Sequence, residues 1–299
     1  MSDSSFIVNL KNEINMEKET ITLTFGESGE NHVGMEMIGN KGGIGDGFNL
    51  EDFLEIKAKI EERIKVNEDF NGSVELIDLR ELIGQDLFVK NKNGEDTDVL
   101  VKDFVDEAYI LIVRNGVELF LGEGGCDALY EQMNGFEWDR KYWDNRRQKV
   151  LNKHTRANVC FDMEGQEPDY ENKKGKVVAY DDVLGVKNIR SGLHELIGEK
   201  GGNLICEGNR YFDLKKCGIG WHGDSERKKV LAFRIGAEMP LKYKWFHNSK
   251  SLGEVCDISL KNGDMYIMSE KATGWDWKRR SLYTLRHSAG CDKYTKVTK

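Results

Sequence analysis

The chain has few of the residues that build covalent or rigid scaffolds: of its 299 residues, six are cysteine and two are proline. No two cysteines form a Cys-x-x-Cys pair, which argues against a zinc ribbon and against a dense disulfide framework. We expect reduced and mostly buried thiols, because a free cysteine packs as a small hydrophobe. The turns must depend on the 32 glycines.

Long apolar runs are also absent. No stretch approaches the roughly 20 apolar residues that span a bilayer, and residues 1–6 lack the basic and apolar regions of a signal peptide. Hydrophobic residues make up 39% of the chain and charged residues 32%, as in globular proteins with a buried core. The sequence therefore predicts an intracellular protein that is not secreted and has no membrane partner.

The net charge of -8 conceals an uneven distribution. Residues 1–139 contain 12 Lys and Arg against 31 Asp and Glu, whereas residues 140–299 contain 32 against 21. Because contacts with phosphates supply most of the nonspecific affinity for nucleic acids, the basic second half permits a nucleic-acid substrate. The alternative is that the two halves neutralise each other across an internal interface.

The first 135 residues predict a mixed α+β domain without a recognisable chemical motif. Residues 20–25 alternate polar and apolar side chains, as in a strand. Apolar residues recur at helical spacing over residues 50–65, which follow the capping residue Asn49. An Asn-Gly dipeptide within residues 108–121 predicts a β-hairpin. The role of this domain stays open.

Residues 136–185 are rich in basic and aromatic side chains and connect this domain to the rest, as a candidate substrate lid. Cations that hold phosphates, interleaved with rings that stack on bases, are typical of a groove for single-stranded nucleic acid. Trp143, Arg147 and Tyr170 are the candidate contacts. A basic amphipathic helix packed on the acidic half is the alternative interpretation.

Residues 186–299 contain eight short apolar segments separated by glycine-rich or charged turns. Short strands without long helices favour a β-barrel or a jelly roll. The predicted fold class is therefore α+β, with a C-terminal jelly roll, or double-stranded β-helix, behind the N-terminal mixed α+β domain.

A His-Gly-Asp triplet, His222 to Asp224, follows one of these strands, and His287 lies in a later one. Two imidazoles and one carboxylate form a ligand set that leaves three coordination positions of a ferrous ion open for a cosubstrate and dioxygen. The sequence therefore predicts that His222, Asp224 and His287 are both metal ligands and catalytic residues of an oxygenase.

The context of this triplet resembles the AlkB family of Fe(II)- and 2-oxoglutarate-dependent dioxygenases. In that family, an Asn-Arg-Tyr strand, here Asn209-Arg-Tyr211, precedes His-x-Asp, and a strand such as 230–236 follows it. The later segment Gly263-Asp264-Met-Tyr-Ile-Met268 is similar to the family's Gly-Asp strand. The resemblance covers residues 200–299, about a third of the chain.

The resemblance implies an enzyme that uses Fe(II), 2-oxoglutarate and dioxygen to oxidise a C–H bond of an alkylated or methylated base. It also implies that Asn209 and Tyr211 form hydrogen bonds with 2-oxoglutarate. The base would come from a single strand or would be extruded from a duplex. Trp221, next to the triplet, is a fourth candidate for stacking on it.

The family's C-terminal Arg-x-Asn-x-Thr-x-Arg strand, which binds the distal carboxylate of 2-oxoglutarate, has no clean match. In the favoured register that strand is 293–299, with Lys293 and Lys299 in place of the arginines and His287 just before it. In the other register it is 280–286, which offers Arg286 as the cation but leaves no histidine upstream to complete the metal ligands.

Two other functions remain open. A lysine at the cosubstrate site is typical of prolyl hydroxylases, so a protein hydroxylase is one alternative. The second is a catalytically inactive jelly roll that binds nucleic acid or protein. The whole chain is also similar to uncharacterised proteins of large DNA viruses, which adds no activity but suggests the cytoplasm or nucleus of a host cell.

Overall fold

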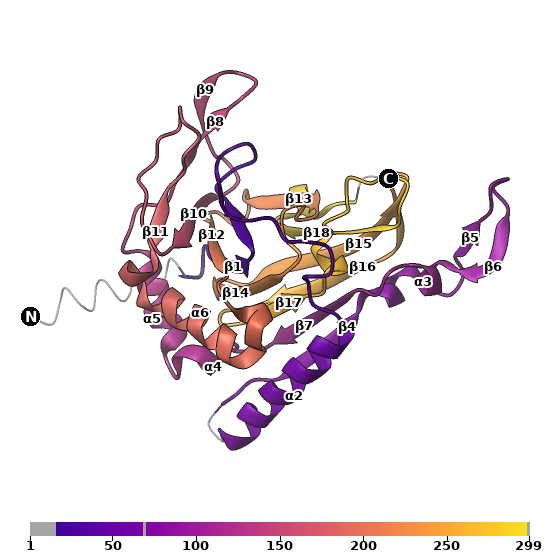
Figure 1. Ribbon diagram of the computed structural model, residues 1–299, viewed down its shortest axis with the longest axis horizontal. Helices are drawn as coiled ribbons and strands as arrows, with labels where there is room; N and C mark the ends of the chain where they lie inside the picture. Colours follow the sequence, from indigo (N-terminus) through magenta and orange to yellow (C-terminus); the bar gives the residue numbers. More distant parts are fainter. Residues whose placement is uncertain (1–15, 68–69, 298–299) are drawn as a thin grey trace, which may run out of the picture.

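The computed structural model describes residues 16–67 and 70–297 and shows a mixed α+β protein made mostly of strands (Figure 1). Its centre is a large, mainly antiparallel sheet of eight strands. In spatial order these are β11 (Val177–Ala179), β10 (Ala157–Asp162), β12 (Ile205–Tyr211), β1 (Thr20–Gly26), β14 (Val230–Gly236), β17 (Met265–Met268), β7 (Tyr109–Val113) and β4 (Val74–Asp78).

A second, four-stranded antiparallel sheet faces part of the large one. Its strands, in spatial order, are β13 (Gly218–His222), β18 (Thr284–Gly290), β15 (Met239–His247) and β16 (Lys250–Leu260). Three two-stranded hairpins complete the strands: β2 (Ser28–Glu30) with β3 (Met37–Gly39), β5 (Phe88–Lys90) with β6 (Asp96–Leu100), and β8 (Lys141–Asp144) with β9 (Lys149–Asn152). The last two hairpins project from the body (Figure 1).

The helices are short apart from two. The α-helices are α2 (Leu50–Val66), α3 (Val101–Phe104), α4 (Glu118–Leu121), α5 (Gly125–Met133), α6 (Leu184–Ile197) and α7 (Asp292–Thr295). Single turns of 3-10 helix are η1 (Leu79–Ile83), η2 (Tyr180–Asp182), η3 (Gly198–Gly201) and η4 (Lys271–Thr273). Within the described residues, no helix is both long and apolar enough to cross a membrane.

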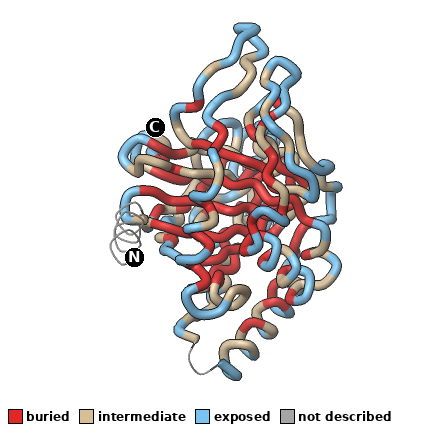
Figure 2. Tube along the Cα trace, turned by 90° about the vertical axis from the view of Figure 1, so that its left-hand side faces the viewer, coloured by how far each residue is buried: buried red, intermediate tan, exposed pale blue. Residues whose placement is uncertain are grey.

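Strand β1 presents apolar side chains to one face of the large sheet and polar side chains to the other. Ile21, Leu23 and Phe25 are fully buried in the core formed with α2, α5 and α6, whereas its threonines point to the opposite face. All seven residues of β1, which pairs with β12 on one side and β14 on the other, are buried. Figure 2 shows the buried stretches, in red, gathered in the middle of the molecule and the exposed ones, in pale blue, mostly around it. Since side chains alternate along a strand, this polar face lines the space between the sheets.

A second core joins the two sheets. Tyr243 and Trp245 of β15 and Leu285 of β18 pack against residues of the large sheet such as Ala232 and Tyr266. Each of these side chains is at most 5% exposed. This core therefore packs β15 and β18 of the small sheet against β14 and β17 of the large sheet.

Two local predictions are confirmed and one is wrong. The strand over residues 20–25 is β1, and the capped helix is α2, where Asn49 accepts a 3.0 Å hydrogen bond from Asp52 N–H. The hairpin over 108–121 does not form: β7 is followed by the helical turn α4, although Asn115 adopts a left-handed turn conformation with φ 56°. Both edges of β7 are already occupied, by β17 and β4.

The eight-stranded sheet contains strands from both sides of the domain boundary that was expected near residue 135. Strands β1, β7 and β4 of the first 135 residues lie in the same sheet as β14 and β17. The segment 136–185 forms a hairpin and two further strands of that sheet, so its interpretation as a basic helix is wrong. The acidic first part and the basic second part of the chain therefore contribute strands to the same sheet.

Candidate metal centre

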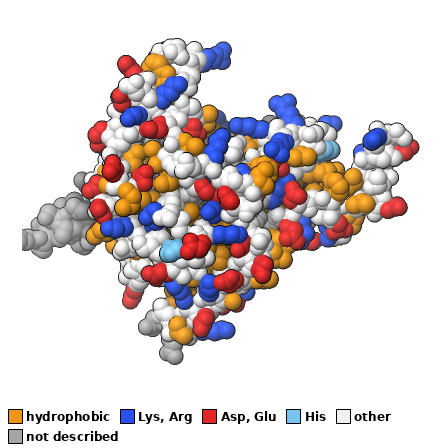
Figure 3. All heavy atoms as spheres, viewed as in Figure 1, with side chains coloured by type: hydrophobic (Ala, Val, Ile, Leu, Met, Phe, Trp, Pro, Cys, Tyr) orange, Lys and Arg blue, Asp and Glu red, His pale blue; other side chains and the backbone are white. Residues whose placement is uncertain are grey.

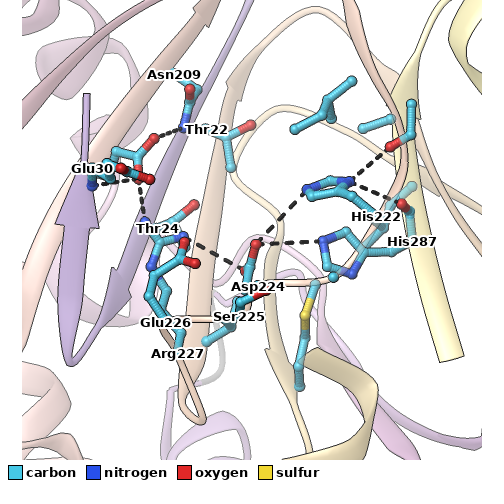
Figure 4. A pocket seen from close by; sticks show the side chains of 18 of the residues that line it. Thr22, Thr24, Glu30, Asn209, His222, Asp224, Ser225, Glu226, Arg227 and His287 are labelled. Atoms are coloured by element: carbon cyan, nitrogen blue, oxygen red, sulfur yellow. Dashed lines mark hydrogen bonds and ion pairs between the residues drawn. The ribbon is translucent and has the colours of Figure 1, made fainter. Parts of the chain in front are cut away.

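The three predicted ligands converge between the sheets. His222 ends β13 and lies directly opposite His287 in the antiparallel register of β13 and β18. Their ring centroids are 4.4 Å apart, and their Nε2 atoms lie 3.8 Å (His222) and 4.0 Å (His287) from Oδ1 of Asp224. One ligand atom from each residue falls within 4.8 Å of the others, so a single cation fits among them (Figure 4).

Glycine at position 223 permits this approach. A Cβ atom there would lie 2.0 Å from the carbonyl oxygen of Gly274, which no real contact allows. The backbone N–H of Asp224 donates a 2.8 Å hydrogen bond to the Thr273 carbonyl in the same turn. The loop that follows β13 therefore packs closely against η4 and the residue after it. This packing orients the side chain of Asp224 toward the two imidazoles.

The electrostatics favour a cation. Burial lowers the pKa of His222 and lowers that of His287 to about 3, with His222 as the second cause for His287. Burial alone would raise the pKa of Asp224, but the charge of Arg227, the largest of the opposing causes, helps to bring it below its usual value. The centre therefore holds two neutral imidazoles and one carboxylate, the protonation state in which they bind metals.

Hydrogen bonding orients one of the imidazoles. Nδ1 of His222 lies 2.7 Å from the Gly220 carbonyl, so it carries the proton and donates it. The lone pair is then on Nε2, which faces Asp224. A metal-binding histidine ordinarily donates its second N–H to a carbonyl or carboxylate in this way.

The centre opens into a cavity of about 590 Å³ between the two sheets. Asn209 and Tyr211, predicted to contact 2-oxoglutarate, both line it. Asn209 Oδ1 accepts a 2.7 Å hydrogen bond from Arg156 Nε, and its Nδ2 donates to Glu207 at 2.9 Å. The structure therefore brings this predicted pair into the same cavity as the three ligands.

Two of the three predicted cations, Lys293 and Arg286, lie outside the cavity. Lys293 lies in α7, a helix where a strand was expected, with its ammonium 5.3 Å from the centre of the Tyr294 ring. Arg286 precedes His287 on β18, so it points to the other face of the sheet, where it stacks on Phe246 at 4.3 Å. Neither lines the cavity. Lys299 lies outside the described residues.

The sequence analysis missed Arg234. This residue of β14 lines the cavity and is 2% exposed, and its Nε and Nη1 have no hydrogen-bond partner within residues 16–67 and 70–297. Its cross-strand neighbour Thr22 also has a buried hydroxyl without a partner in that part of the chain. The visible signal was an arginine inside the apolar strand Val230–Gly236.

Of the four predicted substrate contacts, one lines the cavity and three do not. Trp221 lines the cavity and donates from Nε1 to the Lys296 carbonyl at 3.1 Å. Trp143 lies in β8, Arg147 is exposed at the turn after it, and the Tyr170 hydroxyl donates to Asp139 at 2.8 Å. These three do not line the cavity. Arg156, which the sequence analysis did not single out as a contact, does.

Fold and site together define an α+β protein with a candidate His/Asp/His metal centre between two antiparallel sheets. No protein-family model matches the chain. The chain is 39% identical, over 279 residues, to the uncharacterized protein R156 of Acanthamoeba polyphaga mimivirus, an alignment that covers 93% of this chain and 98% of that protein. The chain therefore belongs to the same family as this viral protein, whose name states no activity.

Proposed function

We propose that this protein is an Fe(II)- and 2-oxoglutarate-dependent dioxygenase that oxidises a C–H bond. The observation that carries the proposal is the convergence of His222, Asp224 and His287 from separate elements. Two imidazoles and one carboxylate on one side of a cation are typical of ferrous oxygenases. Structural zinc sites, in contrast, use four protein ligands, commonly cysteines.

The arrangement of the strands supports a jelly roll. Strands β13, β18, β15 and β16 form one wall, and β12, β1, β14 and β17 form the facing wall. The AlkB resemblance calls for a last strand after His287, but α7 follows β18 instead. We infer that β1 takes that place, between β12 and β14.

Arg234 is the group best suited to bind the distal carboxylate of 2-oxoglutarate. A buried guanidinium without partners is costly, and it becomes favourable when an anion pairs with it. An arginine can grip a carboxylate through two N–H groups, and the Thr22 hydroxyl beside it offers a further donor. Tyr211 and Asn209 lie on the neighbouring strand β12 and face the same cavity.

A ferrous ion held by the three ligands, with 2-oxoglutarate and dioxygen, would supply the oxidising power that inserts an oxygen atom into an unactivated C–H bond. The protein's part is to bind, orient and exclude water. Arg234 and Thr22 would anchor one end of the cosubstrate, Asn209 lies directly opposite Thr22 on β12, Arg156 lines the same cavity, and the walls of both sheets keep the reacting atoms from bulk water.

We propose an alkylated or methylated nucleic-acid base as the substrate. Arg156 and Lys278 line the cavity, and the β8–β9 turn carries Arg146 and Arg147. Lys and Arg side chains are visible on this hairpin and along the neighbouring edge of the molecule (Figure 3). A protein hydroxylase is less favoured, because the lysine that suggested it lies in α7, outside the cavity.

The test is turnover with Fe(II), 2-oxoglutarate and methylated single-stranded oligonucleotides or peptides. Succinate release shows whether the protein is an enzyme, and mass analysis of the oligonucleotides and peptides shows which class is oxidised. His222→Ala should abolish Fe(II)-dependent succinate release, whereas His194→Ala, an exposed histidine on α6, should not. Equal turnover in His222→Ala would overturn the proposal.

A further inference from the structure

Arg227 lies directly behind the candidate metal ligand Asp224. Its guanidinium is buried, and the whole residue is 5% exposed. Nε donates a 2.7 Å hydrogen bond to the Ser28 carbonyl, Nη2 forms an ion pair with Glu207, and Nη1 lies 3.6 Å from Oδ2 of Asp224. Asp224 therefore lies between the two imidazoles on one side and Arg227 on the other (Figure 4).

Three separate elements fix this guanidinium. Arg227 is only three residues beyond Asp224, Glu207 belongs to β12, and Ser28 begins β2. The side chain crosses the end of β1 at Gly26, where an added Cβ would lie 3.0 Å from Arg227 Cδ and 2.6 Å from the Lys229 carbonyl oxygen. The position of the guanidinium is thus determined by the packing around it.

The two oxygens of Asp224 have different neighbours. Oδ1 faces both imidazoles, whereas Oδ2 faces Arg227. A carboxylate with both oxygens free is able to bind a cation through both. Two-oxygen binding at this centre would fill one of the positions that a cosubstrate and dioxygen need.

We propose that Arg227 is a positioning residue that holds Oδ2 of Asp224 away from the metal, so that Asp224 binds through one oxygen and a coordination position stays open for the cosubstrate. This inference rests on the proposed function. Glu207 has a supporting role: it balances the charge of Arg227, and its other oxygen accepts the hydrogen bond from Asn209 in the cosubstrate cavity.

The charge balance decides how the proposal is tested. Removal of Arg227 alone would leave Glu207 as an unpaired buried carboxylate and would destabilise the fold. The informative variant is therefore Arg227→Gln with Glu207→Gln, which removes both charges together. Glu207→Gln alone is the reference for the double variant, because it makes the same change at Glu207 and leaves Arg227 beside Asp224, and Arg227→Lys tests whether a cation alone restores the effect.

The experiment uses the full chain, with Co(II) as a probe that binds without turnover. Co(II) affinity is measured by calorimetry, and 2-oxoglutarate is then titrated against the Co(II)-loaded protein by visible absorption. In the double variant we expect Co(II) affinity to stay within about threefold of wild type and 2-oxoglutarate affinity to fall about tenfold or more. The comparison that isolates Arg227 is with Glu207→Gln: 2-oxoglutarate affinity should be about tenfold or more lower in the double variant than in Glu207→Gln, and Arg227→Lys should keep part of the wild-type affinity.

Each other outcome overturns the inference in a recognisable way. If the double variant binds 2-oxoglutarate as wild type does, Arg227 has no positioning role, and the proposed function stands. If it loses Co(II) and 2-oxoglutarate affinity in parallel, Arg227 is needed only to form the centre. If the wild-type protein itself binds no Co(II), both the inference and the proposed function fail.

Discussion

Thr22 and Arg234 are cross-strand partners, and both side chains reach the cavity beside His222, Asp224 and His287 without a hydrogen-bond partner in the described part of the chain. They are 212 positions apart in the sequence. The pairing of β1 with β14 therefore assembles one wall of the candidate cosubstrate site from two distant parts of the chain. A donor pair of this kind is suited to an anion.

Replacement of Arg234 by methionine should separate ligand binding from stability. Because Nε and Nη1 of the buried guanidinium have no hydrogen-bond partner in the part of the chain that the structure describes, Arg234→Met should leave the ligand-free protein as stable as wild type or more stable by about 1–2 kcal/mol. The same change should lower 2-oxoglutarate affinity at least about tenfold. Denaturant unfolding measures the first effect, and the thermal shift produced by 2-oxoglutarate measures the second.

The matched control is Arg286→Met, on the opposite face of the small sheet from the cavity. It should keep the thermal shift with 2-oxoglutarate. The opposite result, in which Arg286→Met loses the shift and Arg234→Met keeps it, would contradict the proposal. It would show that Arg286, the alternative considered from the sequence, binds the distal carboxylate and that Arg234 does not.

Gly223 should tolerate no side chain. Its Cβ would lie 2.0 Å from the Gly274 carbonyl oxygen, so Gly223→Ala must displace the turn that carries Asp224. We expect a loss of about 2–4 kcal/mol in the free energy of unfolding and weaker Co(II) binding. Gly220→Ala is the control, because its nearest neighbour would be 3.9 Å away. Similar Co(II) affinity in both variants would show that the turn is not what aims Asp224.

The stability of the metal-free protein should depend on His287 at acid pH. Burial lowers its pKa from 6.5 to about 3, so between these pH values the unfolded chain binds a proton that the folded protein does not. Stability must therefore fall as the pH decreases through this window. From pH 7 to pH 4, wild type should lose a few kcal/mol more than His287→Asn in urea unfolding, and parallel pH profiles would contradict this assignment.

The convergence of the three candidate metal ligands was predictable because its signal is local. A His-x-Asp triplet at the end of one strand and a histidine in a later strand need only one pairing, β13 with β18, to converge. The β1 strand and the α2 helix were predictable for the same reason, since alternation and helical spacing are read within a short window.

The proposed cosubstrate cation, Arg234, was not predictable in this way. The arginine at position 234 was visible, but the sequence does not show that its side chain is buried or that its Nε and Nη1 have no hydrogen-bond partner among residues 16–67 and 70–297. The search for a cation after His287 assumed that the strand beside β12 and β14 comes last in the chain, whereas β1 holds that place. Long-range pairing of this kind depends on the whole sheet and cannot be inferred from a short sequence window.

The β8–β9 hairpin provides the test of the proposed nucleic-acid substrate. Its turn carries Arg146 and Arg147, followed by Lys149, all exposed. If these cations contact phosphates, the triple change to glutamine should lower the affinity for single-stranded DNA and reduce the dependence of that affinity on salt, by about 0.7 per lost contact in a plot of log affinity against log salt concentration. Fluorescence anisotropy across a salt series measures both, and 2-oxoglutarate binding should be unchanged because the hairpin turn lies outside the cavity.

An unchanged salt dependence would exclude the hairpin from DNA binding, and absence of DNA affinity in the wild type would shift the substrate from nucleic acid to protein.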